Sequence, residues 1–116
     1  MRPCLVKPVS GMGGRITLPG DKSIAHRAVI LSALSSGKTT IDNIPFNNDL
    51  SATVAVFRSL GVDIKYPSGK GKGVSVTVKG AGARGLQKPV RRLNAGESGT
   101  TMRLLAGLLC AQDFSS

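Results

Sequence analysis

The sequence predicts an α/β fold with an α+β-like arrangement, in which short strands alternate with helices. Three segments have apolar helical patterns, at residues 23–36, 50–60 and 98–111, and β-branched runs lie between them. A chain of 116 residues is one domain or a piece of one. The segments KSIAHRAVILSAL (22–34) and SGTTMRLLAGLL (98–109) are alike, because each opens with small polar residues, places one arginine a turn later and continues apolar. This similarity is a weak indication of repeated folding units.

The first part of the chain predicts two β-like runs, a helix and a strand. The runs at residues 4–9 and 14–18 contain β-forming residues but are interrupted by glycines. A turn at residues 18–21 leads into the helix 23–36. Apolar side chains cover most of the circumference of this helix after its first turn, so we expect it to be buried. A strand rich in β-branched residues follows at residues 38–44.

The second part begins with a helix over residues 50–60, with Asp49 as its predicted N-cap and Gly61 as its stop. Its apolar residues recur on one side, at Leu50, Val54, Phe57 and Leu60. After it we expect two strands, 62–66 and 73–79, separated by a turn at residues 67–69, and Val74, Val76 and Val78 alternate along the second of them. A loop at residues 80–90, a short strand at 93–96 and a third helix at 98–111 follow.

The segment SSGKTT (35–40) ends in the Gly-Lys-Thr that closes a nucleotide-binding P-loop. A P-loop needs a glycine five residues before Gly37, and that position is Ser32. It also follows a strand and opens a helix, whereas here a predicted helix comes first and a predicted strand second. We therefore interpret Gly37 as the residue after a helix, where a left-handed backbone suits glycine.

The charge of the chain favours an anionic partner. Sixteen basic residues and six acidic residues give a net charge of +10, and no acidic residue lies between Ile64 and Gly96. Nucleic acid, a membrane surface or a small phosphorylated ligand would suit such a surface. Nucleic-acid modules usually add exposed aromatic residues, and this segment offers only Tyr66. A solvated loop-and-strand surface is the simpler interpretation of the basic run from residue 70 to 92.

Several classes of protein are disfavoured by composition. Cys4 and Cys110 are too few for a disulfide framework and lack metal-ligand spacing. The longest apolar run, residues 104–111, is far shorter than the about 20 residues needed to cross a bilayer. The start of the chain has no signal-peptide pattern, so we expect a cytoplasmic protein without a membrane partner.

Lys22, Ser23 and Arg27 are candidates for an anion site at the start of the first predicted helix. A helix start presents unpaired N–H groups and a positive dipole end. Ser23 adds a hydroxyl, Arg27 lies one turn later and can bind a phosphate or carboxylate through two N–H groups, and Lys22 adds a mobile charge. The alternative is a capping serine beside two solvated charges, since this spacing is common.

A second candidate lies between Asn94 and Arg103, where glycines and hydroxylated residues precede the third predicted helix. Small residues at such a turn let a ligand approach the backbone N–H groups. The alternative is an ordinary tight turn with a capping residue. His26, the only histidine, could act as an acid or a base, but the sequence shows no partner for it.

Three segments in order closely resemble the N-terminal part of the 5-enolpyruvylshikimate-3-phosphate synthase family: LPGDKSIAHRAVILSALSSGKTTIDNI, NDLSATVAVFRSLGVDI and GESGTTMRLLAGLL. These enzymes are also called 3-phosphoshikimate 1-carboxyvinyltransferases. They serve aromatic amino-acid synthesis and are the target family of glyphosate. The resemblance implies that residues 1–116 are mainly the first domain of an enolpyruvyl transferase, without the rest of that domain. Such domains consist of repeated βαβαββ-type units in an inside-out α/β barrel.

The resemblance also implies a reaction. The 5-hydroxyl of shikimate 3-phosphate adds to phosphoenolpyruvate, and the tetrahedral intermediate expels phosphate, with no metal and no organic cofactor. Lys22 would touch both substrates, with Ser23 and Arg27 on shikimate 3-phosphate. Gly99 and Thr100 match the phosphoenolpyruvate-binding turn. Two anionic substrates account for the basic composition without nucleic acid, and we expect a monomer.

Three departures from the family pattern matter. Glu97 stands where many members have asparagine, and a carboxylate there should weaken anion binding unless it pairs with a cation or points away. Ala25 stands where serine is usual, and we expect little effect. The chain is well short of half such an enzyme, so the residues that complete the site would lie downstream. We assign no catalytic residue within it and expect it to be inactive alone.

Two alternatives remain. UDP-N-acetylglucosamine enolpyruvyl transferase shares the fold and the chemistry. It has asparagine where this chain has Ser23, however, and a reactive cysteine in a loop, whereas Cys110 lies in a predicted apolar helix. A basic module for RNA or another polyanion is the alternative from a different class. Steep salt dependence of nucleic-acid binding would favour it.

Overall fold

The structure is a computed structural model that describes residues 3–66 and 71–116. Its elements are, in chain order, α1 (Lys22–Leu34), β1 (Ser36–Phe46), α2 (Asn48–Ser59), β2 (Asp63–Lys65), β3 (Gly71–Ala81) and α3 (Gly99–Leu109). The turn predicted at residues 67–69 lies outside the described residues. The order from α1 to β3 is that of a βαβαββ-type unit without its first strand, which agrees with the α/β prediction.

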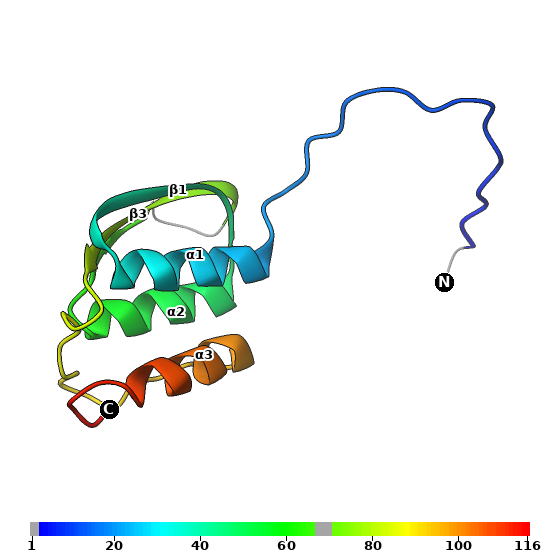
Figure 1. Cartoon of the computed structure of the whole chain (residues 1–116). Helices are drawn as coiled ribbons and strands as arrows, with labels where there is room; N and C mark the ends of the chain where they lie inside the picture. Colours follow the sequence, from blue (N-terminus) through cyan, green and yellow to red (C-terminus); the bar gives the residue numbers. More distant parts are fainter. Residues whose placement is uncertain (1–2, 67–70) are drawn as a thin grey trace.

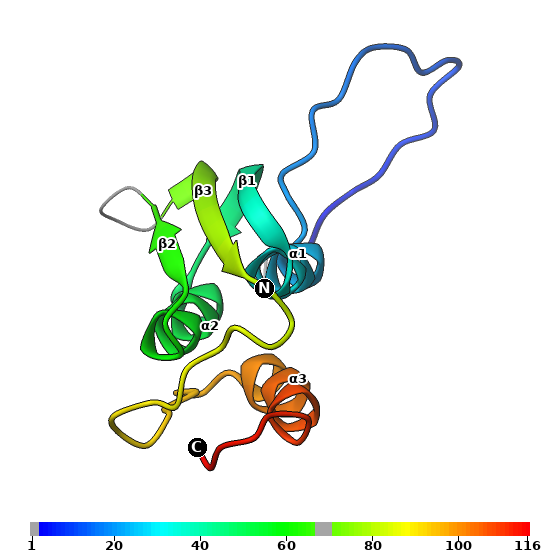
Figure 2. The same cartoon turned by 60° about the vertical axis from the view of Figure 1, so that its left-hand side comes forward.

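Within the described residues, the strands form a three-stranded antiparallel sheet in the order β1-β3-β2. Since β1 and β2 both pair with β3, they run parallel to each other on its two sides. Helices α1 and α2 cover one face of the sheet, and α3 lies on the far side of α2 (Figures 1 and 2). The fold therefore has a sheet layer, a layer of two helices and a third helix stacked beneath them.

The core fills the space between the sheet and the first two helices. The four apolar residues expected on one side of the second helix, Leu50, Val54, Phe57 and Leu60, are all fully buried. On β3 the alternation is also confirmed, because Val76 and Val78 are fully buried between outward-facing neighbours. A core of this kind packs α1 and α2 against the sheet.

The start of α2 differs from the prediction that Asp49 would cap it. Asn47 has an extended backbone, and its side-chain oxygen accepts a hydrogen bond from the N–H of Leu50 at 3.0 Å. Asp49 consequently lies inside the first turn of the helix. Gly61 ends the helix as predicted: it has a φ of 88°, and its N–H donates to Arg58 while that of Val62 donates to Phe57.

Helix α1 is less buried than its apolar circumference suggested. Ile24 and Leu31 are 64% and 67% exposed, because only one face of the helix meets the sheet and α2. Gly37 is not the residue that follows the helix. The helix ends at Leu34 with Ser35 as its cap, and Gly37 lies within β1, where its φ of 98° requires glycine.

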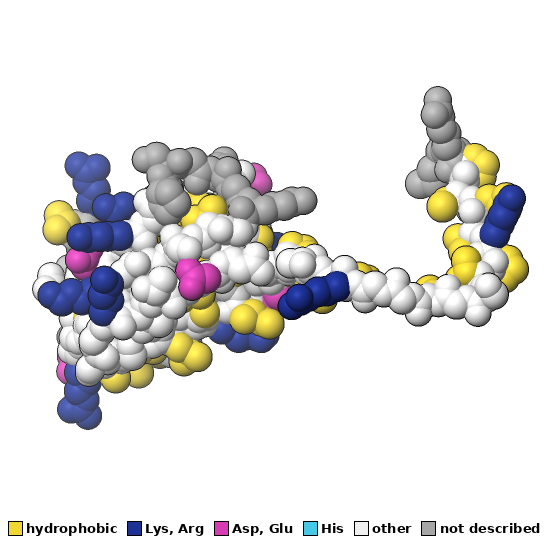
Figure 3. All heavy atoms as spheres, turned by 90° about the horizontal axis from the view of Figure 1, so that it is seen from above, with side chains coloured by type: hydrophobic (Ala, Val, Ile, Leu, Met, Phe, Trp, Pro, Cys, Tyr) yellow, Lys and Arg dark blue, Asp and Glu magenta, His cyan; other side chains and the backbone are white. Residues whose placement is uncertain are grey.

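Three predicted β runs do not form strands. Residues 3–19 extend away from the domain (Figures 1 and 3), and the runs at 4–9 and 14–18 make no strand pairs with the described chain. The run at 93–96 is also irregular. A strand needs a neighbour to take its backbone hydrogen bonds, so β-forming residues alone do not make one. Among the described helices, none has both the length and the apolar character to cross a membrane.

Candidate functional site

Three helices begin at the same end of the molecule (Figure 1). The ammonium of Lys22, in the first turn of α1, lies 2.8 Å from a carboxylate oxygen of Asp49, in the first turn of α2. The hydroxyl of Thr101, in the first turn of α3, lies 3.4 Å from the backbone carbonyl of Asp49. The positive ends of three helix dipoles therefore converge, and this arrangement favours an anion.

The start of α1 leaves two backbone donors available. Asp21 accepts the N–H of Ile24 with its carboxylate at 2.7 Å and the N–H of Ala25 with its carbonyl at 3.0 Å. The N–H groups of Lys22 and Ser23 have no acceptor within the helix. Both of these residues are exposed, so they can offer backbone and side-chain donors to the same ligand.

The start of α3 repeats this pattern. Ser98 accepts the N–H of Thr101 with its hydroxyl at 3.2 Å and the N–H of Met102 with its carbonyl at 3.1 Å. The N–H groups of Gly99 and Thr100 remain, and both residues are exposed. A Cβ at Gly99 would meet no atom within 4 Å, so a ligand can approach the backbone there.

All five predicted substrate-binding residues lie on these two helix starts. Lys22, Ser23 and Arg27 are exposed along the first turns of α1, and Gly99 and Thr100 open α3. Among the described residues, the structure pairs Lys22 with an acid but gives Arg27 no salt bridge. The tertiary structure therefore brings the two predicted groups to one end of the domain.

The sequence did not identify Asp49 as part of this site. Its hydrogen bond with Lys22, together with the charge of that lysine, lowers the pKa of the Asp49 carboxyl below its ordinary value of 3.8. The two residues are 27 positions apart, and no spacing rule connects them. The only sequence signal was an acid near a helix start, which we interpreted as a cap.

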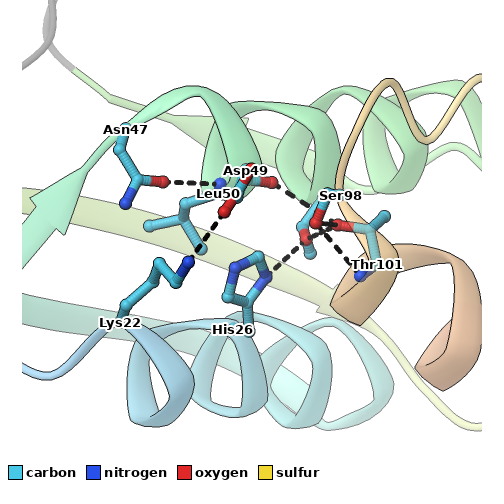
Figure 4. Close-up of polar contacts among 8 residues, drawn as sticks. Lys22, His26, Asn47, Asp49, Leu50, Ser98 and Thr101 are labelled. Carbon is cyan, nitrogen blue, oxygen red and sulfur yellow. Dashed lines mark hydrogen bonds and ion pairs between the residues drawn. The ribbon is translucent and has the colours of Figure 1, made fainter.

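A buried row of hydrogen bonds lies behind the helix starts (Figure 4). His26 Nδ1 lies 2.7 Å from the Thr53 hydroxyl, which lies 2.7 Å from the Thr101 hydroxyl, and Thr101 donates to the Ser98 hydroxyl at 2.7 Å. All four residues are buried, and His26 has no exposed surface. Sequence reasoning found no partner for His26 because Thr53 and Thr101 come from other helices.

Burial lowers the pKa of His26 below its ordinary value of 6.5. The charge of Asp49 raises this pKa, and that of Lys22 lowers it, by smaller amounts. The buried Nε2 atom of His26 has no hydrogen-bond partner among the described atoms. A neutral imidazole is therefore the form that this environment favours.

Two further predictions can be compared with the structure. Glu97 is exposed and forms no salt bridge with the described part of the chain, so the expectation that it weakens anion binding stays a prediction. Cys110 does not lie inside a helix as expected: it is the exposed residue that caps the end of α3. In residues 3–66 and 71–116, no three His, Cys, Asp or Glu side chains are grouped to hold a metal ion.

Known proteins match this chain over most of its length. Residues 6–116 match the family model of EPSP synthase (3-phosphoshikimate 1-carboxyvinyltransferase). The chain belongs to the EPSP synthase family. The 3-phosphoshikimate 1-carboxyvinyltransferase of Acidithiobacillus ferrooxidans is 50% identical over 112 residues, which are 97% of this chain and 25% of that protein. The Geobacillus kaustophilus enzyme of the same name is 50% identical over 106 residues, which are 91% and 24% of the two chains.

Solved structures show the same family likeness. EPSP synthase from Acinetobacter baumannii superimposes with a TM-score of 0.77 at 42% identity, over 87% of this chain and 22% of that one. The likeness confirms the predicted fold as part of the enolpyruvyl transferase fold. The chain spans about a quarter of the length of the curated EPSP synthases that it matches.

Proposed function

We propose that this chain supplies part of the substrate site of an enzyme that transfers the enolpyruvyl group of phosphoenolpyruvate to the 5-hydroxyl of shikimate 3-phosphate. The observation that carries this proposal is the convergence of three helix starts, joined by the Lys22–Asp49 ion pair and the Thr101–Asp49 contact. Such a site suits two anions held side by side. Membership of the EPSP synthase family supports the choice of substrates.

The first turn of α1 is the proposed site for shikimate 3-phosphate. The free N–H groups of Lys22 and Ser23 and the hydroxyl of Ser23 can donate to one phosphate. Arg27 follows Ser23 by four residues on the same exposed side and can donate two parallel N–H bonds. A dianionic phosphate would therefore be bound by neutral and charged donors together.

The first turn of α3 is the proposed site for phosphoenolpyruvate, with the N–H groups of Gly99 and Thr100 as donors. Lys22 can serve both anions, because its partner Asp49 lies on α2, the helix between the other two. Its ammonium is a mobile charge on a flexible stem, so it can exchange the carboxylate of Asp49 for a substrate oxygen.

In the proposed reaction, the 5-hydroxyl gives its proton to a base as its oxygen bonds to C2 of phosphoenolpyruvate, and C3 takes a proton from an acid. Loss of that C3 proton and cleavage of the C–O bond to phosphate then restore the double bond. Lys22 and the helix starts would stabilise the negative charge on the transferring groups. We place the acid and base groups in the part of the longer enzyme that this chain does not include. We infer a cytoplasmic, monomeric protein without a nucleic-acid partner.

A polyanion-binding module is the second candidate, and one observation favours it. Lysine and arginine side chains gather at the end of the domain opposite the N-terminal segment (Figure 3). There, Lys38, Lys65 and Lys79 line a groove of 510 Å³ on the sheet together with Asp63. This groove lies apart from the helix starts, so the two candidates predict ligand responses in different residues.

The deciding experiment is an amide-resolved NMR titration of the chain with shikimate 3-phosphate. Saturable shifts centred on residues 22–27, lost in Arg27→Ala and kept in the control Arg84→Ala, would support the proposal. Arg84 is an exposed arginine outside the site. Shifts centred on Lys38, Lys65 and Lys79, with a similar response to a single-stranded oligonucleotide, would favour the polyanion module instead. A folded chain with no shift at residues 22–27 would contradict the assignment.

A further inference from the structure

One side chain from each of the three helices takes part in the buried row of hydrogen bonds behind the site. His26 comes from α1, Thr53 from α2 and Thr101 from α3, and the successive distances are 2.7 Å. The row therefore connects the helix that carries Lys22 with the helix that carries Gly99. It does not reach the exposed surface, because all three side chains are buried.

With Thr101 as the donor to Ser98, the number of hydroxyl protons gives this row a single direction. Thr101 donates its one hydroxyl proton to the Ser98 oxygen at 2.7 Å, with the Asp49 carbonyl at 3.4 Å as a more distant acceptor. The Thr101 oxygen must then accept a hydrogen bond from the Thr53 hydroxyl. Thr53 has only one hydroxyl proton, and this hydrogen bond uses it. Thr53 can therefore only accept from His26, so Nδ1 of His26 carries a hydrogen.

This direction explains the unpartnered Nε2 atom of His26. With the proton on Nδ1, a neutral imidazole has only a lone pair on Nε2. A buried acceptor without a partner costs less than a buried donor without one. The other neutral tautomer would bury an unpartnered N–H at Nε2 and would also remove the donor that Thr53 requires.

The row of hydrogen bonds affects the site because it helps to hold α3 in place. This helix packs against α2, and its buried residues are Thr101 and Leu105. Leu105 contributes an apolar contact, which sets the distance between the helices but allows them to slide past each other. Thr101 makes directional hydrogen bonds at the N-terminal end, one residue after the turn formed by Gly99 and Thr100.

We propose that His26, Thr53 and Thr101 form a positioning relay, with neutral His26 protonated on Nδ1, that fixes the α3 anion turn relative to the start of α1. The purpose of the relay depends on the proposed function, because the two helix starts are the proposed sites of two substrates. None of its residues touches a substrate. Ordinary core packing would require neither this tautomer nor a hydroxyl at residue 53.

The first test needs no ligand. Nitrogen-15 spectra of the His26 ring in the unmutated chain should show a protonated Nδ1 and an unprotonated Nε2 at neutral pH. A ring protonated on Nε2 would overturn the relay. In Thr53→Val, which keeps the shape but removes the hydroxyl, the hydrogen-bonded amides of Thr101 and Met102 should exchange with solvent at least about tenfold faster. This factor corresponds to losing one net hydrogen bond of about 1.4 kcal/mol.

The matched control is Thr53→Ser, which keeps the hydroxyl and should restore both the tautomer and the slow exchange. Amides in the core of β3, such as those of Val76 and Val78, should change little in Thr53→Val. An equal acceleration of exchange throughout the chain would contradict a positioning role, because it would report only a loss of overall stability.

The second test uses shikimate 3-phosphate. In the unmutated chain its shifts should extend from residues 22–27 to residues 99–101, and in Thr53→Val the shifts at 99–101 should be lost while those at 22–27 remain. Shifts at 99–101 that persist in Thr53→Val would show that the ligand acts there directly and would overturn the coupling. If no residue responds to shikimate 3-phosphate, the proposed function fails, and the ligand-free measurements still decide the relay.

Discussion

The ammonium of Lys22 lies 2.8 Å from the carboxylate of Asp49, so the lysine proposed to touch both substrates is held by an acid from a neighbouring helix. The two side chains are 50% and 35% exposed, and water competes for both. An anion that binds at the helix starts must compete with Asp49 for this ammonium. The ion pair therefore adjusts the affinity of the site more than the stability of the fold.

Replacing Asp49 should strengthen anion binding. In Asp49→Asn, we expect the dissociation constant for shikimate 3-phosphate to fall by roughly threefold or more at low salt, because a negative charge leaves the site. Lys22→Met should raise it. Calorimetric titrations of both variants, repeated in high salt where the differences should shrink, measure these changes. Weaker binding by Asp49→Asn would instead mean that the carboxylate is needed to orient Lys22.

Stability should depend on pH through His26. Because burial lowers the pKa of this side chain below 6.5, the unfolded chain binds its proton more tightly than the folded chain does. The contribution to the free energy of unfolding is present above pH 6.5 and is lost as the pH falls toward the folded-state pKa. Urea unfolding at several pH values between about 5 and 8 measures this loss, which His26→Gln should flatten. An unmutated chain with constant stability over this range would argue against a neutral buried His26.

Protonation of Asp49 should change the stability of the chain in a separate and more acidic pH range. The hydrogen bond from Lys22 lowers the pKa of its carboxyl below 3.8, so the contribution of Asp49 is present above pH 3.8 and disappears at lower pH. In Asp49→Asn the profile should lose this acidic step and keep the step below pH 6.5 that belongs to His26. The same urea experiments, extended to about pH 3, distinguish the two groups.

Gly80 should not tolerate a side chain. A Cβ there would collide with the backbone carbonyls of Ser32 and Ser35, where the end of α1 crosses β3. We expect Gly80→Ala to lower the free energy of unfolding by about 1–3 kcal/mol, since backbone atoms must move. Gly107→Ala is the matched control: it lies in open space within α3 and should raise stability by roughly 0.5–1 kcal/mol. Equal effects of the two substitutions would contradict this packing.

A substitution at Gly99 should change ligand binding without changing the stability of the fold. Its Cβ position is free of neighbours within 4 Å, so Gly99→Ala should leave the unfolding midpoint nearly unchanged. The new methyl group would occupy the space through which phosphoenolpyruvate is proposed to reach the backbone. We expect weaker binding of phosphoenolpyruvate and little change for shikimate 3-phosphate, measured by titration of each. Unchanged affinity for both would remove Gly99 from the proposed site.

The chain alone should not catalyse the reaction. It spans about a quarter of the length of the EPSP synthases that it matches, and the residues proposed to bind the substrates include no assigned acid or base. Incubation with both substrates should therefore release no inorganic phosphate above the uncatalysed background. Sustained phosphate release by the purified chain, absent in Arg27→Ala, would show that the catalytic groups lie within these residues.

Local sequence patterns determined the helices, the central strands and the candidate binding residues. Helical periodicity predicted the core side of α2, because burial repeats every three to four residues in a helix. Alternating valines predicted β3, because burial repeats every second residue in a strand. Lys22, Ser23 and Arg27 could be proposed because donors at a helix start follow from the backbone geometry of any helix. Composition favoured strands at 4–9, 14–18 and 93–96, but strands depend on pairing partners that composition does not supply.

Only the tertiary structure decided which distant residues meet. The pairing of Lys22 with Asp49, and the row from His26 through Thr53 to Thr101, join helices that are separated by tens of residues in the chain. The sequence showed a histidine without a partner and an acid that resembled a cap. Their contacts became apparent from the packing of three helix starts at one end, because hydrogen bonds and ion pairs depend on distances of about 3 Å that sequence separation does not encode.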